Sequence, residues 1–369
     1  MKIGYLIGAL KTGGSERQLS ELAVGMVARG HGVEVACYDG PGTFDGFVEA
    51  GGARIRWTGG RSKLEKLMGI RAWIAESRPD ILHGFMKRAS SLAVLGNLPL
   101  RRCKVIASDY STASYARHKW DLWASLALWS LADRVATQTE MNRRNLCLLA
   151  PWIRSKVVIV RNGVEITRFV PPERRAAGPA YRFLVVGTVY RVKNPVGLVE
   201  AVRILKAETA EQFVVRWVGP TSHGGVDTEE YRTAANLVRR YGLSDVVSFA
   251  GPAARMEEEY RWADCLVHVS LQEGMPNAVV EAMACGLPIV VSGVSDLPLL
   301  VRAASNGFVC EETRPASIAA AMGGAMRLPW QERVAMGERS RKLAEEWFGR
   351  ARFLDAYEGI YRELVPGAI

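Results

Sequence analysis

Short apolar runs alternate with amphipathic helical patterns along nearly the whole chain of 369 residues, and this alternation constrains the fold most. Apolar runs of about four to eight residues separated by helical patterns are typical of parallel sheets, because each crossover between parallel strands needs a long connection. The first half contains strand-like runs at 2–8, 32–38, 80–85, 104–109, 134–139 and 156–163. The second half contains runs at 181–187, 213–219, 246–251, 265–270 and 287–292. The alternation therefore predicts an α/β fold with parallel, doubly wound sheets.

Residues 170–181 interrupt this alternation with a stretch rich in Pro, Ala, Gly and Arg that has no periodicity. Such a composition is typical of a linker. The chain is also too long for one ordinary hydrophobic core. We therefore predict an N-terminal domain at 1–169, a linker at 170–181 and a second domain that begins at residue 182. Each domain would contain one doubly wound sheet, with a cleft between the two domains.

The N-terminal stretch "MKIGYLIGAL" has one Lys and a short apolar run, but we interpret it as a first strand and not as a signal peptide. A polar turn and an amphipathic helix follow it, and we expect this helix at Ser15–Arg29, with Ser15 as its cap and Gly30 as its end. No apolar run reaches the ~18 residues that span a bilayer. The six cysteines are scattered and include no CxxC pair, which favours reduced thiols and a cytoplasmic protein.

The net charge of +10 is unevenly distributed along the chain. Residues 81–132 contain two acidic residues, Asp109 and Asp121, and seven basic ones: Lys87, Arg88, Arg101, Arg102, Lys104, Arg117 and Lys119. The same segment contains Trp120, Trp123 and Trp129. Basic residues interleaved with Trp suit an anionic membrane surface or an anionic substrate. The alternative is a solvated basic face with the Trp side chains in the core, and the sequence leaves both interpretations open.

Two glutamates eight positions apart, Glu273 and Glu281, occupy the otherwise apolar stretch "EGMPNAVVEAMACG". A helix that begins near Asn277 and Ala278 would direct its amides and the positive end of its dipole toward an anion. Glu281 would lie about one turn further along the same face, where a carboxylate can accept hydrogen bonds from a diol such as ribose. Glu273 would lie in the loop before the helix, beside the same anion.

These residues resemble the Glu-x7-Glu motif of the retaining glycosyltransferases of family 4 (GT4), which have the GT-B fold of two Rossmann-like domains that face a central cleft. The resemblance extends over nearly the whole chain. It includes "KTGGSERQLSELA", "VVIVRNGVEITRFVPP", "FLVVGTVYRVKNPVGLVEAV" and, as the strongest match, "YRWADCLVHVSLQEGMPNAVVEAMACGLPIVVS". It implies that the N-terminal domain binds an acceptor and that the domain at 182–345 binds a nucleotide sugar. The closing "EEWFGRARFLDAYEGIYREL" resembles the family's last helix, so that 346–369 would return to the first domain.

The resemblance implies a role for each residue that matches the motif. Glu273 would contact the transferred sugar as the catalytic carboxylate, and Glu281 would hold the ribose. Lys193 and Arg191 would neutralise the donor diphosphate, since the leaving group gains negative charge in the transition state. The remaining donor contacts would come from Gly13 and Gly14 to the diphosphate, from Gly274, Met275, Asn277 and Ala278 to the sugar or phosphate, and from Met256 to the base.

The chain departs from the family pattern at two places. Many members have an Arg where this chain has Thr188, so the role of that arginine passes to Arg191. Many members also have a His after the fourth strand of the first domain, where this chain reads "IASDYS" and His118 comes several residues later. Asp109 is the candidate substitute for contact with the sugar or the acceptor. An ordinary loop aspartate is the alternative.

The resemblance therefore implies a cytoplasmic, retaining hexosyltransferase whose donor is a nucleotide sugar, with UDP favoured over GDP. We expect no cofactor and no metal, because Asp-x-Asp is absent and the five histidines lack metal-ligand spacing. The expected acceptor is a glycan or a lipid-linked molecule of bacterial-type surface polysaccharide synthesis, reached by peripheral contact with the inner face of an anionic cell membrane. A soluble small acceptor is the alternative, and we expect no nucleic acid partner. A GT-B-fold nucleotide-sugar epimerase and a catalytically silent nucleotide-sugar-binding scaffold remain the other function classes.

Overall fold

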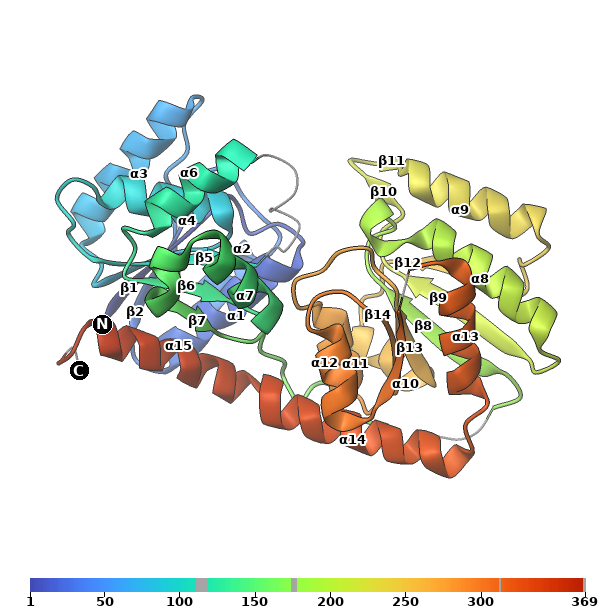
Figure 1. Ribbon diagram of the computed structural model, residues 1–369. Coiled ribbons are helices and arrows are strands. Elements are labelled where there is room, and N and C mark those ends of the chain that lie inside the picture. The colour runs from blue at the N-terminus through green and yellow to red at the C-terminus, as the bar shows by residue number, and fades with distance from the viewer. Residues whose placement is uncertain (111–118, 174–177, 312, 368–369) are drawn as a thin grey trace. The chain divides into compact units, whose positions relative to one another are not determined.

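The computed structural model describes residues 1–110, 119–173, 178–311 and 313–367 (Figure 1). The chain forms two compact units. Unit 1 contains Met1–Gly163 together with Arg350–Ile369, and unit 2 contains Val164–Gly349. The chain thus passes into unit 2 ahead of the linker expected at 170–181, and it returns to unit 1 at Arg350.

Unit 1 is built on a seven-stranded sheet with the order β3-β2-β1-β4-β5-β6-β7, in which every neighbouring pair is parallel. Its strands are β1 (Lys2–Ile7), β2 (Gly32–Cys37), β3 (Arg54–Trp57), β4 (Ile81–Gly84), β5 (Lys104–Asp109), β6 (Arg134–Thr137) and β7 (Val157–Ile159). The central strands are apolar on both faces, because helices cover both sides of a parallel sheet. β3 was not predicted, since its sequence "RIRW" lies at an exposed edge and has no apolar run.

Helices cover both faces of this sheet, as Figure 1 shows. One face packs against α1 (Gly14–Ala28), α2 (Asp45–Ala50) and the C-terminal helix α15 (Arg350–Leu364). The other face packs against α3 (Lys63–Ser77), α4 (Lys87–Asn97), α6 (Lys119–Trp129), α7 (Glu140–Leu149) and the 3₁₀ helix η1 (Pro151–Lys156). Successive residues of one strand therefore enter different cores: Tyr5 packs with α1 and α15, and Leu6 with α3 and α4.

The start of α1 differs by one residue from the sequence-based expectation. Gly13, and not Ser15, is the N-cap, with extended backbone at φ −167°. The carbonyl of Gly13 accepts the first helical hydrogen bond, from Arg17 N at 3.1 Å, which leaves Ser15 inside the first turn. The predicted end is confirmed, because Gly30 follows the helix with φ +83°, a left-handed conformation that glycine adopts without strain.

Unit 2 is built on a six-stranded parallel sheet with the order β12-β9-β8-β13-β14-β15. Its strands are β8 (Tyr181–Val186), β9 (Phe213–Val218), β12 (Val247–Gly251), β13 (Cys265–His268), β14 (Ile289–Ser292) and β15 (Gly307–Cys310), with a small hairpin of β10 (Ser222–His223) and β11 (Val226–Asp227). One face packs against α8 (Pro195–Glu208), α9 (Glu229–Arg240) and α13 (Pro315–Met326). The other packs against α10 (Met256–Trp262), α11 (Asn277–Ala284), α12 (Leu297–Ala304) and α14 (Trp330–Phe348). Among the described residues, no helix combines the length and the apolar character needed to cross a bilayer.

Each sheet has one point at which the strand order reverses. In unit 1 the chain proceeds outward from β1 on one side and from β4 on the other, and in unit 2 it does so from β8 and β13. Loops at such a point diverge to opposite faces of the sheet and leave a crevice at the carboxyl ends of the strands, where ligands bind. The topology therefore indicates one candidate binding edge in each unit.

The contact between α15 and the sheet of unit 1 includes buried polar groups. His83 Nδ1 lies 2.9 Å from the Tyr361 hydroxyl, and His83 Nε2 lies 2.6 Å from Ser108 Oγ. The Tyr361 hydroxyl is also 3.3 Å from that of Tyr5. Burial lowers the pKa of His83 to about 3, so its ring is neutral near pH 7. A neutral buried ring needs a hydrogen-bond partner for each polar nitrogen, and α15 supplies one of them.

We predict that Tyr361→Phe destabilises unit 1 by about 1–3 kcal/mol, because it leaves His83 Nδ1 buried without this partner. Tyr5→Phe is the matched control, since it removes a neighbouring buried hydroxyl and keeps the His83–Tyr361 contact. Urea denaturation followed by tryptophan fluorescence measures both changes in the free energy of unfolding. An equal loss in the two variants would contradict this account of α15.

Candidate active site

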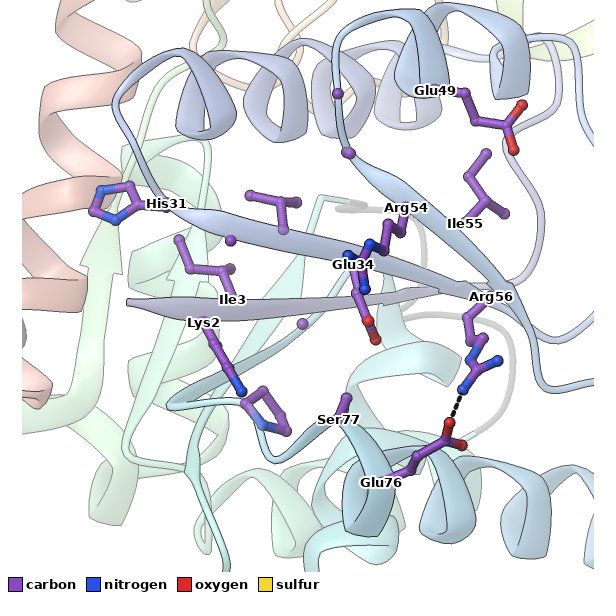
Figure 2. Close-up of a pocket in the computed structure, with 16 residues that line it drawn as sticks. Lys2, Ile3, His31, Glu34, Glu49, Arg54, Ile55, Arg56, Glu76 and Ser77 are labelled. Carbon is purple, nitrogen blue, oxygen red and sulfur yellow. Dashed lines mark hydrogen bonds and ion pairs between the residues drawn. The ribbon is translucent and has the colours of Figure 1, made fainter.

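A pocket of about 880 Å³ in unit 1 is lined by residues at the amino ends of β1, β2 and β3 (Figure 2). Some of its charged groups have partners within the pocket or beside it: Arg56 pairs with Glu76, and Glu34 accepts a hydrogen bond from the Trp73 indole at 2.9 Å. Ligands of parallel α/β sheets bind at the opposite, carboxyl edge. This pocket is therefore not the candidate site.

The candidate donor site lies at the carboxyl ends of β8 and β13 in unit 2, where a carboxylate lies between two nitrogen donors. Lys193 Nζ donates a hydrogen bond to Glu273 Oε1 within an ion pair. His268 Nε2 lies 2.9 Å from the same oxygen. Lys193 comes from the 3₁₀ helix η2 (Arg191–Lys193) after β8, His268 is the last residue of β13, and Glu273 is in the following loop. The reversal of strand order thus joins residues 80 positions apart.

The environment of Glu273 keeps it ionised. Burial alone would raise its pKa, but the hydrogen bond from His268 and the charge and hydrogen bond of Lys193 outweigh burial and hold the pKa well below its ordinary value. Burial and the charge of Lys193 lower the pKa of His268 against the opposing effect of Glu273. A neutral imidazole that donates from Nε2 fits this arrangement. The site therefore presents a fixed negative charge beside a cationic ammonium.

Glu281 lies on α11, and its carboxylate is buried. Glu281 Oε2 accepts a hydrogen bond of 2.8 Å from the hydroxyl of Tyr260 on α10. Met256 begins α10, four residues before Tyr260, so the two share one face of that helix. The predicted base contact, Met256, thus lies on α10, and Tyr260 of the same helix donates a hydrogen bond to the predicted ribose ligand, Glu281, on α11.

The loop between Glu273 and α11 contains the predicted backbone contacts. Pro276 is the N-cap of α11, and its carbonyl accepts hydrogen bonds from the amides of Val279 and Val280. Asn277 and Ala278 form the first turn, and Gly274 and Met275 lead into it. The positive end of the α11 dipole is therefore at this loop, as an anionic ligand would require.

Arg191 and Lys193 lie together in η2, directly after the turn that contains Thr188. The turn begins at Gly187, whose φ of +142° favours glycine and where a Cβ would lie 3.2 Å from Lys193 Cε. Leu271 N donates to the carbonyl of Val192 at 2.8 Å, which ties the loop after β13 to η2. Arg191 is exposed. The two cations therefore share one short segment that is held against the loop of Glu273.

The remaining predicted residues lie in unit 1. A second pocket, of about 530 Å³, opens at the carboxyl edge of the sheet and is lined by Asp109, Lys11, Glu16, Lys87 and Arg88 together with apolar residues and others. Asp109 ends β5 and is buried. Gly13 and Gly14, which lie between Lys11 and Glu16 in the sequence, are the N-cap and the first residue of α1. Arg117 and His118 lie outside the described residues.

Two members of the unit 2 site, His268 and Tyr260, were missed by sequence reasoning. His268 interrupts the apolar run "CLVHVS", and a polar residue at the end of a buried strand could have indicated it. Tyr260 gave no such signal, because its partner Glu281 lies 21 residues away. His268 is a hydrogen-bond partner of Glu273, and Tyr260 is one of Glu281. The roles of all these residues in binding and catalysis remain predictions.

The lowered pKa of Glu273 predicts an acid-dependent loss of stability. Its ordinary value is 4.5 and its folded value is lower, so as the pH falls the unfolded chain takes up this proton first. The contribution of the Glu273 carboxylate to the free energy of unfolding is therefore complete above its pKa in the unfolded chain. It is lost as the pH falls toward its pKa in the folded protein. Glu273→Gln removes it, and we expect the difference in free energy of unfolding between wild type and variant to shrink from about pH 7 to about pH 3.

Urea denaturation across this pH range measures the difference for Glu273→Gln. Glu258→Gln is the matched control, because Glu258 is exposed on α10. A difference for Glu273→Gln that stays constant with pH would contradict the assigned direction of the pKa shift.

Comparisons with known proteins cover both units. The family model described as Glycosyltransferase Family 4 matches residues 12–168, and the one described as Glycosyl transferases group 1 matches residues 169–343. A D-inositol 3-phosphate glycosyltransferase of Kineococcus radiotolerans is 32% identical over 253 residues, which are 63% of this chain and 58% of that protein. Two further relatives are also named D-inositol 3-phosphate glycosyltransferase, and the chain spans between 58% and 62% of the length of these three proteins.

Solved structures with low sequence identity have the same fold. HepE of Anabaena in complex with UDP and glucose matches with a TM-score of 0.83 at 17% identity, over 98% of this chain and 99% of that one. WaaG, a glycosyltransferase involved in lipopolysaccharide biosynthesis, matches with a TM-score of 0.75 at 17% identity, over 99% and 100%. With the two parallel sheets described above, these matches identify the fold as GT-B. The two family models together extend over both units, and the chain belongs to glycosyltransferase family 4.

Proposed function

We propose that this chain is a retaining, metal-independent glycosyltransferase that moves a hexose from a nucleoside-diphosphate sugar to a glycan or lipid-linked acceptor. The observation that carries the proposal is the ionised Glu273 held by Lys193 and His268 at the strand-order reversal of unit 2. A cation and a carboxylate side by side suit a donor that has an anionic diphosphate next to a neutral sugar. Family membership supports the same reaction class.

In this proposal the donor lies along the loop that starts α11. Lys193 and Arg191 neutralise the diphosphate, and the α11 dipole adds to their field. Glu281 accepts hydrogen bonds from the ribose hydroxyls, oriented by Tyr260. UDP is the favoured nucleotide, which is supported by a similar fold in HepE of Anabaena, whose structures contain UDP or UDP-glucose.

Retention of configuration follows from attack on the face from which the diphosphate leaves. The bond between the anomeric carbon and the phosphate oxygen breaks, and the acceptor oxygen forms its bond to that carbon on the same face. The acceptor proton passes to the departing phosphate oxygen, so the donor itself acts as the base. Glu273 orients the sugar, and its charge stabilises the positive charge that develops on the ring.

Metal independence rests on the cations of η2. A diphosphate leaving group needs positive charge nearby, and Lys193 and Arg191 provide it without an ion. Within the described part of the chain, no group of three or more His, Cys, Asp or Glu side chains is arranged to hold a metal ion. EDTA treatment tests this part of the proposal directly.

The acceptor part of the proposal concerns the 530 Å³ pocket of unit 1. Lys11, Lys87 and Arg88 supply positive charge there, and Glu16, Asp39 and Asp109 supply carboxylates, of which Asp39 lies 3.8 Å from Arg88. Cations next to hydrogen-bond acceptors suit a hydroxylated acceptor that bears an anionic group, as a phosphate-linked glycan or lipid does. We infer a role in bacterial-type surface polysaccharide synthesis, in the cytoplasm and in peripheral contact with the anionic inner face of the cell membrane.

We predict that UDP raises the melting temperature more than GDP, ADP or dTDP at equal concentration. A ligand that binds only the native state stabilises it by about 2.7 kcal/mol at a hundred times its Kd. The shift is expected to persist in EDTA, since the proposal contains no metal. Differential scanning fluorimetry measures it. No shift with any of the four nucleotides would argue against a nucleotide-diphosphate donor.

Glu281→Ala tests the ribose contact in the same assay. Loss of a hydrogen bond to a charged group costs about 1.5–3 kcal/mol, which corresponds to about a 10- to 100-fold weaker UDP affinity. Glu258→Ala, on the exposed face of α10, is the matched control and should bind UDP as the wild type does. An unchanged affinity in Glu281→Ala would remove Glu281 from the proposed site.

A further inference from the structure

Three tryptophans form an exposed aromatic surface on unit 1. Trp120 and Trp123 lie on α6 with 88% and 43% of their area exposed, and Trp152 of η1 is 55% exposed. The rings of Trp123 and Trp152 stack at 6.5 Å between centroids and 24° between planes. Trp120 is three residues before Trp123, on the same side of the helix. We call Trp120, Trp123 and Trp152 the aromatic surface.

This surface is distinct from the hydrophobic core that α6 also enters. Leu122, Leu126 and Trp129 form the buried face of α6, in the core beneath α4. Of the three tryptophans that the sequence places in this basic segment, one is therefore a core residue and two are exposed. A helix that is apolar on opposite faces needs a second apolar environment beyond its own core.

Three arginines on α7, η1 and the loop that contacts the end of α6 outnumber the one exposed carboxylate of α6 next to the tryptophans, Asp121. Arg154 follows Trp152 by two residues in η1, and Arg144 lies on α7 four residues before Leu148, which is itself 68% exposed. Arg101 donates to the carbonyl of Leu131, just after α6, at 3.1 Å. No carboxylate of the described residues forms an ion pair with any of these three arginines, whereas nearby Arg143 pairs with Glu140.

We propose that the aromatic surface and its arginines dock the protein on an anionic lipid bilayer. Tryptophan prefers the headgroup level of a bilayer, because its ring is apolar and its indole N–H is polar. Arginines beside it attract anionic headgroups, each with about a fivefold gain in affinity. The inference rests on the proposed function, since a lipid-linked acceptor is presented at such a surface.

The charge pattern favours a bilayer over a second copy of this chain. In a symmetric dimer through this surface, the same patch faces itself, so a surface whose arginines outnumber its carboxylate would meet its own excess of positive charge. Like charges brought together at an interface oppose association. An anionic bilayer offers apolar depth for the indoles and opposite charge for the guanidinium groups at once.

Vesicle flotation of the full chain at low salt tests the proposal. We expect flotation with vesicles of phosphatidylcholine and phosphatidylglycerol, and little with phosphatidylcholine alone. Trp120→Ala/Trp152→Ala should weaken binding about tenfold or more, because two interfacial side chains are lost. Arg144→Gln and Arg154→Gln should each weaken it about fivefold. If the tryptophan variant is misfolded by circular dichroism, the arginine variants carry the test.

Matched controls come from the opposite edge of the sheet of unit 1. Trp57→Ala removes a tryptophan that is 50% exposed on β3, and Arg54→Gln removes an exposed cation of the same strand. Both should bind vesicles within about twofold of wild type. Equal losses in the controls, or equal binding to neutral vesicles, would overturn the proposal. The proposal would also be overturned if the wild type bound no vesicles but formed a dimer that the tryptophan variant does not form. The aromatic surface would then bind a second copy of this chain.

UDP binding separates this inference from the proposed function. The tryptophan variant should keep the wild-type thermal shift with UDP while it loses vesicle binding. UDP stabilisation without any vesicle binding by the wild type would overturn the docking proposal alone. Vesicle binding without any nucleotide binding would overturn the proposed transferase activity and leave the docking surface in place.

Discussion

The contact of Glu273 with Lys193 and His268 is the interaction on which the candidate site depends. A carboxylate that is mostly buried is costly unless opposite charge and hydrogen bonds compensate for its lost solvation. Lys193 supplies the charge and His268 supplies a hydrogen bond. The result is a negative group that is fixed in place before any ligand arrives, next to a cation. Preorganised charge of this kind is what stabilises a transition state with separated charges.

The fold makes this contact available through its topology. β8 and β13 are neighbours in the sheet although more than seventy residues separate them, so η2 and the loop of Glu273 emerge side by side. Glycine at 187 lets Lys193 pack closely over the turn, and the Leu271–Val192 hydrogen bond holds the two loops together. α11 then continues from the same loop and carries Glu281 toward Tyr260. The same topological rule leads to the pocket of Asp109 in unit 1.

Much of the fold could be predicted from the sequence, because apolar runs and helical patterns are local signals. Four strands were missed: β3 and β15, which are short edge strands without a long apolar run, and the two-residue strands β10 and β11 of the small hairpin. Glu273, Glu281 and Lys193 could be indicated by a motif. The hydrogen bonds of His268 and Tyr260 to these glutamates could not be predicted, since they depend on side-chain orientation and, for Tyr260, on how two helices pack. The exposure of Trp120 and the burial of Trp129 were likewise undecided, because both are apolar residues of one helix.

Calorimetric titration of Glu273→Gln with UDP and with UDP-glucose tests the central claim most directly. If Glu273 contacts the sugar and not the nucleotide, the variant should bind UDP as the wild type does and should bind UDP-glucose about tenfold or more weakly. Lys193→Met should weaken both ligands, because the diphosphate is common to them. The comparison is informative when the wild type binds UDP-glucose more tightly than UDP. In that case, equal affinities of Glu273→Gln and wild type for UDP-glucose would contradict the assigned contact of Glu273 with the sugar.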